Sequence, residues 1–320
     1  MMKQPLIILT GPTASGKTSL SVSLAKRIGG EIISADSMQV YRYMDVGSAK
    51  VTKEEMEGVP HHLIDVLDPK EPFDVVRFQT MAKEALKRIR DNGHIPIVAG
   101  GTGFYIQALL NDIDFTENDS DTEYRSMLEA LSREKGAEYL HEMLRQNDPE
   151  SAEAIHANNT KRVIRALEFY KKTGKKISAH NEEERNRQSP YNFAYYVLTM
   201  ERARLYERID RRVDMMMENG LLREVMQLKE LGCSREMVSM QGLGYKEILD
   251  YLNGEISLEE AVYIIKRDTR HFAKRQLTWF KREREVEWID QEKFSFDKEK
   301  ILQWMMEDLK SRGILEKEQE

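Results

Sequence analysis

The sequence predicts an α/β protein in which a parallel sheet lies between layers of helices and a mostly helical domain interrupts the chain. Three observations support this fold class. Short apolar runs alternate with helical patterns over the first 112 residues. A glycine-rich loop joins the first apolar run to the first helical pattern. Residues 113–190 contain no strand-like run. Strands that alternate with helices are typical of parallel sheets covered on both faces.

The first elements follow from hydrophobic periodicity. Residues 5–10 form a continuous apolar run that leads into a glycine loop, as expected for a buried parallel strand. In residues 17–28, Leu20, Leu24 and Ile28 share one helical face. We expect further strands at 32–35, 63–67 and 95–99, and helices near 75–90 and 104–110.

The pattern changes after residue 112. Residues 113–190 are polar and mostly helical, whereas 194–199 again has a strand-like composition and the chain from 201 is helical almost to its end. We therefore predict a core with C-terminal helices, formed by residues 1–112 and 191–320, and a helical insertion domain at 113–190.

Composition limits the class of protein. No apolar run is long enough to cross a bilayer, and no secretory signal precedes the first predicted strand. The single cysteine, Cys233, excludes an internal disulfide framework and a multi-cysteine zinc site. We expect a cytoplasmic protein without membrane association. The net charge of −6 argues against nucleic-acid binding by the whole surface, but one basic face would suffice.

The glycine-rich loop is a complete phosphate-binding P-loop. It consists of Gly11, Pro12, Thr13, Ala14, Ser15, Gly16, Lys17 and Thr18. Its glycines let backbone amides point inward, and the following helix adds its positive end. Lys17 supplies charge to the outer phosphates, and the Thr18 hydroxyl is placed to bind Mg²⁺. The strand before the loop and the helix after it disfavour an ordinary glycine turn.

A P-loop alone does not define a reaction. Most P-loop NTPases place an aspartate at the end of a later apolar strand, where it helps to bind Mg²⁺ and to position the attacking water. Here the apolar run 95–99 ends in glycines, and Asp65 lies in a weaker run. This pattern argues against simple ATP hydrolysis.

Two further strand ends carry polar residues. Asp36 follows the second predicted strand, and it could bind Mg²⁺, accept a substrate hydrogen bond, act as a general base, or only cap its turn. Thr102 stands among Gly100, Gly101 and Gly103, which allow close approach of a ligand or form a tight turn. Ligands bind at the carboxyl ends of parallel strands, so we expect these ends and the P-loop to meet in one cleft.

Two segments are rich in basic residues. Residues 266–284 hold eight Lys or Arg and two acids, and 161–176 hold seven and one. In the first, a shared helical face carries Arg267, His271, Lys274, Arg275, Thr278 and Arg282. Such stripes suit phosphate contacts, although a solvated basic face is the alternative. His61 and His62 lack further metal ligands nearby, so packing is their expected role.

Together these motifs resemble the tRNA dimethylallyltransferase family, also called tRNA isopentenyltransferases. The resemblance spans residues 5–282, and no zinc-finger extension of the eukaryotic kind follows, so it is to the bacterial type. It implies a P-loop NTPase-like core. Besides the P-loop, the matching segments are 36–50, 61–65, 100–106, 159–168, Gly244-Tyr245 and 273–280.

The resemblance implies a specific reaction. Dimethylallyl diphosphate donates its five-carbon group to N6 of adenosine 37 in a tRNA anticodon loop, and diphosphate leaves. Under this interpretation the P-loop, Lys17 and a Mg²⁺ cofactor at Thr18 stabilise the leaving group. Asp36 acts as the general base, and Thr102 orients a substrate.

The resemblance also implies contacts with the tRNA anticodon stem-loop. This RNA and dimethylallyl diphosphate would be the partners of the protein, and we expect the protein to be a monomer. These contacts fall on Asp36, Ser37, Met38, Gln39, Thr102, Arg125, Thr160, Lys161, Arg162, Val163, Ile164, Gln241, Gly244, Tyr245, Lys274, Arg275, Gln276 and Thr278.

Three other functions share some of these features. A small-molecule or nucleotide kinase would use the same P-loop for ATP. An isopentenyltransferase acting on free adenine nucleotides would not explain the long insertion and the basic helix. An RNA-binding P-loop protein without enzymatic activity would leave Asp36 without a role.

Overall fold

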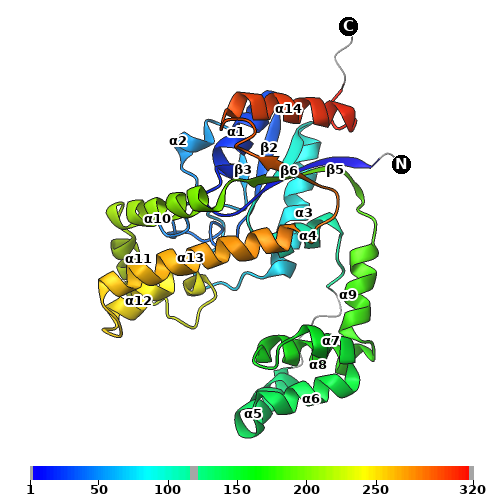
Figure 1. Cartoon of the computed structure of the whole chain (residues 1–320), viewed down its shortest axis with the longest axis vertical. Helices are drawn as coiled ribbons and strands as arrows, with labels where there is room; N and C mark the ends of the chain where they lie inside the picture. The colour runs from blue at the N-terminus through cyan, green and yellow to red at the C-terminus, as the bar shows by residue number, and fades with distance from the viewer. Residues whose placement is uncertain (1–2, 116–121, 317–320) are drawn as a thin grey trace. The chain divides into compact units, whose positions relative to one another are not determined.

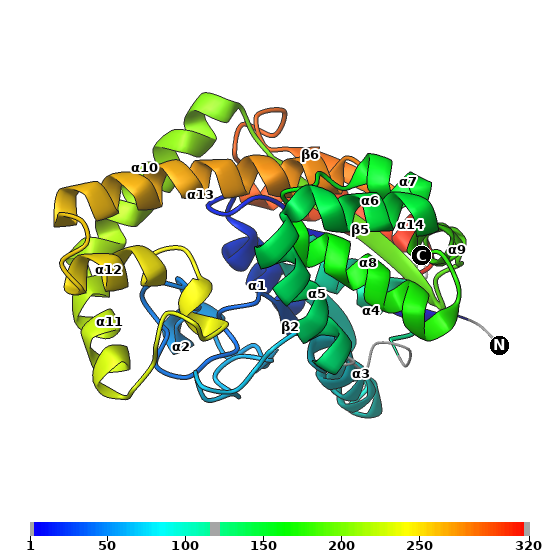
Figure 2. The same cartoon turned by 90° about the horizontal axis from the view of Figure 1, so that it is seen from below.

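The computed structural model describes residues 3–115 and 122–316. The chain forms two compact units, one from Met1–Leu109 with Pro190–Glu320 and the other from Leu110–Ser189 (Figures 1 and 2). The boundaries expected from sequence, after residues 112 and 190, lie close to these limits.

The first unit contains a parallel sheet. Its six strands are β1 (Gln4–Thr10), β2 (Gly30–Ala35), β3 (His61–His62), β4 (Ile95–Gly100), β5 (Tyr191–Thr199) and β6 (Val286–Asp290). Their order is β3-β2-β4-β1-β5-β6, and each pairing is parallel. Thr10 and Ala35 both pair with Gly100, so the carboxyl ends of the three central strands lie at one level.

Helices cover both faces of the sheet. α1 (Lys17–Ile28) and α14 (Lys298–Ser311) pack on one face, and α3 (Val75–Asp91) and α4 (Gly103–Leu110) lie on the other (Figure 1). Alternate residues of β1 point to opposite faces, yet Leu6 to Leu9 are all at most 1% exposed. This two-sided burial explains why the strand has a continuous apolar sequence.

The C-terminal helices extend the first unit beside the sheet. They are α10 (Arg202–Glu218), α11 (Leu221–Glu230), η1 (Ser239–Gln241), α12 (Tyr245–Leu252) and α13 (Leu258–Phe280). α13 lies along α10 in both views (Figures 1 and 2). Arg270 and Lys266 of α13 form ion pairs with Asp210 and Asp214 of α10, which fixes the rotation of α13 about its axis.

Three sequence expectations on strands are corrected. The predicted strand at 63–67 is absent from the described chain, because Leu63 and Asp65 have φ angles of +63° and +55° that break an extended backbone. The short strand β3 precedes it. β5 begins three residues before the expected start. The edge strand β6 was missed, because its two acidic residues interrupt the apolar pattern.

The second unit is helical, as expected. It contains α5 (Thr122–Lys135), α6 (Ala137–Asn147), α7 (Pro149–Ala154), α8 (Thr160–Thr173) and α9 (Ile177–Asn186). Leu128, Leu140, Leu144 and Val163 are fully buried in its core. The buried Asp148 carboxylate accepts hydrogen bonds from both the backbone N–H and the hydroxyl of Ser151 and Ser178, tying α7 to α9. Across residues 3–115 and 122–316, no helix is long and apolar enough to span a membrane.

Candidate active site at the P-loop

The P-loop between β1 and α1 has the curled backbone that phosphate binding requires. Gly11 and Gly16 have φ angles of +150° and +91°, and a Cβ on Gly11 would lie 2.7 Å from the Leu198 carbonyl oxygen of β5. Gly16 caps α1 without a side-chain hydrogen bond, so the first amides of this helix face the loop. The Lys17 ammonium donates to the Pro12 carbonyl at 2.8 Å, across the loop.

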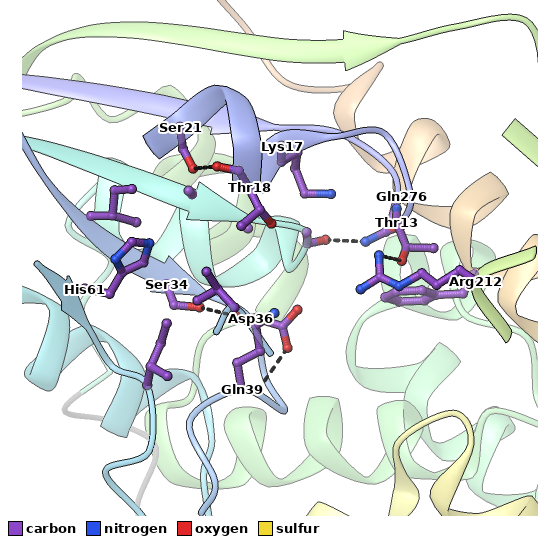
Figure 3. Close-up of a pocket in the computed structure, with 17 residues that line it drawn as sticks. Thr13, Lys17, Thr18, Ser21, Ser34, Asp36, Gln39, His61, Arg212 and Gln276 are labelled. Carbon is purple, nitrogen blue, oxygen red and sulfur yellow. Dashed lines mark hydrogen bonds between the residues drawn. The ribbon is translucent and has the colours of Figure 1, made fainter. Parts of the chain in front are cut away.

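The three predicted strand ends meet in one cavity. The Thr102 N–H donates to the Ala35 carbonyl at 3.1 Å, which places Thr102, two residues after β4, against the end of β2. Figure 3 shows the cavity formed between these ends. Its lining consists of Thr13, Lys17, Thr18, Ser21, Ile32, Ser34, Asp36, Gln39, Val51, His61, Ile64, Ala99, Gly100, Gly101, Arg212, Phe272 and Gln276. The third strand end contributes Gly100 and Gly101 to the lining, whereas Thr102 is not among the lining residues.

Asp36 uses its two carboxylate oxygens differently. Oδ1 accepts hydrogen bonds from the backbone N–H of Met38 at 2.8 Å and of Gln39 at 3.3 Å, so it caps the turn that follows β2. Oδ2 has no hydrogen bond within the described residues, and the carboxylate lines the cavity. The capping role and a catalytic role are therefore compatible, because they occupy different oxygens.

The electrostatics of the cavity favour an anion. Burial, and then the neighbouring Arg212 guanidinium, lower the pKa of Lys17 to about 7, while Asp36 opposes this shift. Burial also lowers the pKa of Arg212, again against the effect of Asp36. Two crowded cations share one carboxylate, so a diphosphate placed between them would relieve their repulsion.

Arg212 is a site residue that the sequence did not identify. It comes from α10, and its Nη1 lies 3.5 Å from the Thr13 hydroxyl of the P-loop. The available signal was its position beside the buried stripe of Leu205, Ile209 and Val213, which directs it toward the core. The distance of about 200 residues to the P-loop hid this contact from motif reading.

The cavity offers oxygen ligands suited to Mg²⁺. Within the described chain, no cluster of three or more His, Cys, Asp or Glu could hold a metal by itself. Thr18 and Asp36 nevertheless contribute a hydroxyl and a carboxylate to the lining. Mg²⁺ is commonly bound by one or two protein oxygens together with substrate phosphates and water. The residues present therefore fit a Mg²⁺ ion that is held jointly with a diphosphate.

The predicted RNA contacts on α8 divide by burial. Lys161 and Arg162 are exposed and Thr160 is partly exposed at the start of the helix. Val163 and Ile164 are 0% and 4% exposed in the core of the second unit, so side-chain contact with RNA is not available to them. Their apolar side chains pack in this core, so any contact of these two residues with RNA would be made by the backbone.

The other predicted RNA residues also differ in accessibility. Lys274, Arg275 and Thr278 are exposed on α13, Gln241 is exposed on η1, and Ser37, Met38 and Gln39 are partly exposed after β2. Arg125 forms an ion pair with Glu168 inside the second unit, and Arg267 and His271 pair with Asp268 within α13. Gly244 and Tyr245 are buried.

Tyr245 instead supports the loop that follows Asp36. The buried Glu224 carboxylate accepts hydrogen bonds from the Asp45, Val46 and Gly47 amides at 2.7–3.0 Å and from the Tyr245 hydroxyl at 2.9 Å. A Cβ on Gly47 would lie 2.6 Å from the Tyr245 ring. This packing fixes residues 45–47 against α11 and α12, and it gives the Tyr245 side chain a structural role in the described chain.

Comparisons with known proteins agree with this geometry. Residues 39–283 match the family model described as IPP transferase. Proteins named tRNA dimethylallyltransferase from Lachnoclostridium phytofermentans and Carboxydothermus hydrogenoformans are 61% and 52% identical to the chain. The alignments cover 98% and 94% of this chain and 99% and 97% of those proteins.

Solved structures are similar as well. The tRNA isopentenylpyrophosphate transferase of Bacillus halodurans is 46% identical, with a TM-score of 0.73 over 98% of both chains. A eukaryotic dimethylallyltransferase studied acting on tRNA is 32% identical, with a TM-score of 0.77 over 90% of this chain and 74% of that one. The chain therefore belongs to the IPP transferase family.

Proposed function

We propose that the protein transfers a dimethylallyl group from dimethylallyl diphosphate to N6 of adenosine 37 in the tRNA anticodon loop. The observation that carries this proposal is one cavity lined both by the phosphate-binding residues Lys17 and Thr18 and by the carboxylate of Asp36. This pairing supplies a leaving-group site and a base on either side of a reacting carbon.

The chemistry follows from these positions. The C–O bond between the allylic carbon and the diphosphate breaks, and the electron pair leaves with the diphosphate oxygen. The N6 nitrogen forms the new C–N bond, and its proton passes to Oδ2 of Asp36. Lys17, Arg212 and the amides of the P-loop stabilise the charge on the departing diphosphate. Thr102, beside Asp36, helps to orient the base or the donor.

Mg²⁺ fits this scheme as a cofactor. Thr18 would hold it, and Asp36 supplies the carboxylate of the cavity lining. When bound, the ion supplies positive charge to the diphosphate.

The proposed second substrate is the anticodon stem-loop of a tRNA. An adenine must leave its stack to reach a buried site, and single-stranded loops permit this at the lowest cost. Exposed basic residues suit the flanking phosphates, namely Lys161 and Arg162 on α8 and Lys274 and Arg275 on α13. We expect the protein to act in the cytoplasm as a monomer.

A kinase is the main rival function. It would need the P-loop to hold ATP and a strand-end aspartate to serve Mg²⁺ and the acceptor. Of the two strands that flank β1, β4 ends in Gly100 followed by Gly101, and the Gly101 carbonyl accepts a hydrogen bond from Gln276, so Asp36 after β2 is the carboxylate that lines the cavity. This arrangement supports group transfer without a water-activating acid.

One experiment separates the candidates. The purified protein is incubated with Mg²⁺, dimethylallyl diphosphate and an unmodified tRNA transcript, and the nucleosides are analysed by mass spectrometry. Parallel reactions replace the tRNA with AMP or the donor with ATP. We expect prenylated adenosine only with donor and tRNA together. ATP consumption without prenylated adenosine would favour the kinase, and prenylated AMP would favour the free-nucleotide enzyme.

A further inference from the structure

Gln276 lies within the basic segment of α13, where the sequence resemblance predicts a tRNA contact. Its side chain is not on the surface, because the residue is only 6% exposed. Its carboxamide Oε1 accepts a hydrogen bond from the Thr13 N–H at 2.9 Å, and its Nε2 donates to the Gly101 carbonyl at 3.0 Å (Figure 3). Both polar atoms are therefore used inside the protein.

Both partners of Gln276 belong to the diphosphate site. Thr13 lies in the first half of the P-loop, and Gly101 follows the central strand β4. A Cβ on Gly101 would stand 2.3 Å from Nε2 of Gln276, so only glycine leaves room for this bridge. The same carboxamide thus explains one of the glycines of the 100–103 segment as a packing requirement.

We propose that Gln276 is a positioning residue for the diphosphate donor rather than a tRNA contact. It anchors the first half of the P-loop to β4, so that the amides from Ser15 to Thr18 are oriented before the donor binds. Backbone N–H groups that are already fixed in position bind an anion without the entropic cost of being ordered on binding. The identity of the donor rests on the proposed function, but the anchoring does not.

The direct test measures the affinity for pyrophosphate, which is the product that would occupy the diphosphate subsite. Isothermal titration with Mg²⁺-pyrophosphate compares the full-length protein with Gln276→Ala and with the control Gln227→Ala, an exposed glutamine of α11. Two net hydrogen bonds of ordinary strength correspond to roughly thirtyfold weaker binding in Gln276→Ala. The control is expected to bind as the parent does. In transfer assays, the KM for the donor rises while the KM for tRNA is unchanged.

Gly101→Ala provides an independent route to the same state. Its new Cβ displaces the Gln276 carboxamide without removing it, so pyrophosphate binding weakens similarly. Because both substitutions break one bridge, the double variant Gln276→Ala/Gly101→Ala binds no more weakly than Gln276→Ala alone. Additive losses would contradict the proposal.

The outcomes separate this proposal from the function on which it builds. Unchanged pyrophosphate affinity with a raised KM for tRNA would overturn it and return Gln276 to the RNA surface. If the parent protein forms no prenylated adenosine but Gln276→Ala still weakens pyrophosphate binding, the proposed function fails while the anchoring role stands. Thermal unfolding of each variant verifies that the fold is intact.

Discussion

Replacing Asp36 with asparagine isolates its catalytic oxygen from its structural one. The asparagine carbonyl can still accept the hydrogen bonds that Oδ1 receives from the Met38 and Gln39 amides. Only Oδ2, the oxygen that has no hydrogen bond within the described residues, is replaced by a group that cannot accept a proton. Asp36→Asn therefore keeps the turn, whereas Asp36→Ala also loses a cap worth about 1 kcal/mol.

The expected effect is large and confined to turnover. A positioned general base contributes about 10²- to 10⁴-fold to rate, which corresponds to roughly 2.7–5.5 kcal/mol of transition-state stabilisation. We expect kcat for prenyl transfer to fall by that factor, with pyrophosphate and tRNA affinities nearly retained. The control is Asp68→Asn, because Asp68 caps its own turn through Oδ1, which accepts from the Lys70 N–H at 3.0 Å.

The assay follows prenylated adenosine under single-turnover conditions, with pyrophosphate affinity measured separately. It is run from pH 6 to 8, because Asp36 raises the pKa of Lys17 and its loss lowers that pKa further. A tenfold or smaller loss of the rate constant at every pH would refute the role of Asp36 as base.

Three further predictions concern charge. The pKa of Lys17 is lowered to about 7, so this side chain loses its charge and pyrophosphate affinity falls as pH rises through 7. At pH 7.5 the binding of pyrophosphate should therefore be coupled to proton uptake, which calorimetric titration in buffers of different ionisation enthalpy measures. The Lys17→Met variant should take up fewer protons on binding. Glu224→Gln loses charge-assisted hydrogen bonds to three backbone amides, so it should lower the free energy of unfolding, measured by urea denaturation, by about 2 kcal/mol. The control Glu230→Gln, at an exposed position, should leave the free energy of unfolding unchanged. Equal effects of the two substitutions would contradict the structural role of Glu224. Lys274→Ala should reduce the magnitude of the slope of log K for tRNA binding against log salt concentration by about 1, whereas the control Lys300→Ala on α14 should not change it. An unchanged slope in Lys274→Ala would exclude a phosphate contact at Lys274.

Local pattern predicted most of the sheet and the centre of the site. The P-loop and the turn at Asp36 are each a short continuous segment that can be recognised in the sequence. The rule that ligands bind at the carboxyl ends of parallel strands then predicts that the two segments lie close together. β6 and the break at Leu63 were missed because edge strands tolerate charge and because positive φ angles have no reliable signature in non-glycine residues.

Roles that depend on long-range packing could not be predicted from sequence. Arg212 reaches the cavity from α10, and Gln276 reaches it from α13, through contacts that only the folded core defines. Tyr245 and Val163 were assigned to RNA through the family resemblance, although both side chains are buried. A motif gives the position of a residue in the chain, whereas burial decides which of its atoms can meet a ligand.

The central claim is that the P-loop holds a leaving group while carbon is transferred. Dimethylallyl diphosphate labelled with ¹⁸O in the oxygen that joins carbon to phosphorus tests it directly, after reaction with unmodified tRNA. Cleavage of the C–O bond predicts that all of the label leaves in pyrophosphate and that N6-dimethylallyladenosine forms in equal amount. Label retained in dimethylallyl alcohol, with the diphosphoryl group transferred to an acceptor, or in dimethylallyl monophosphate, with the terminal phosphoryl group transferred, would contradict the account.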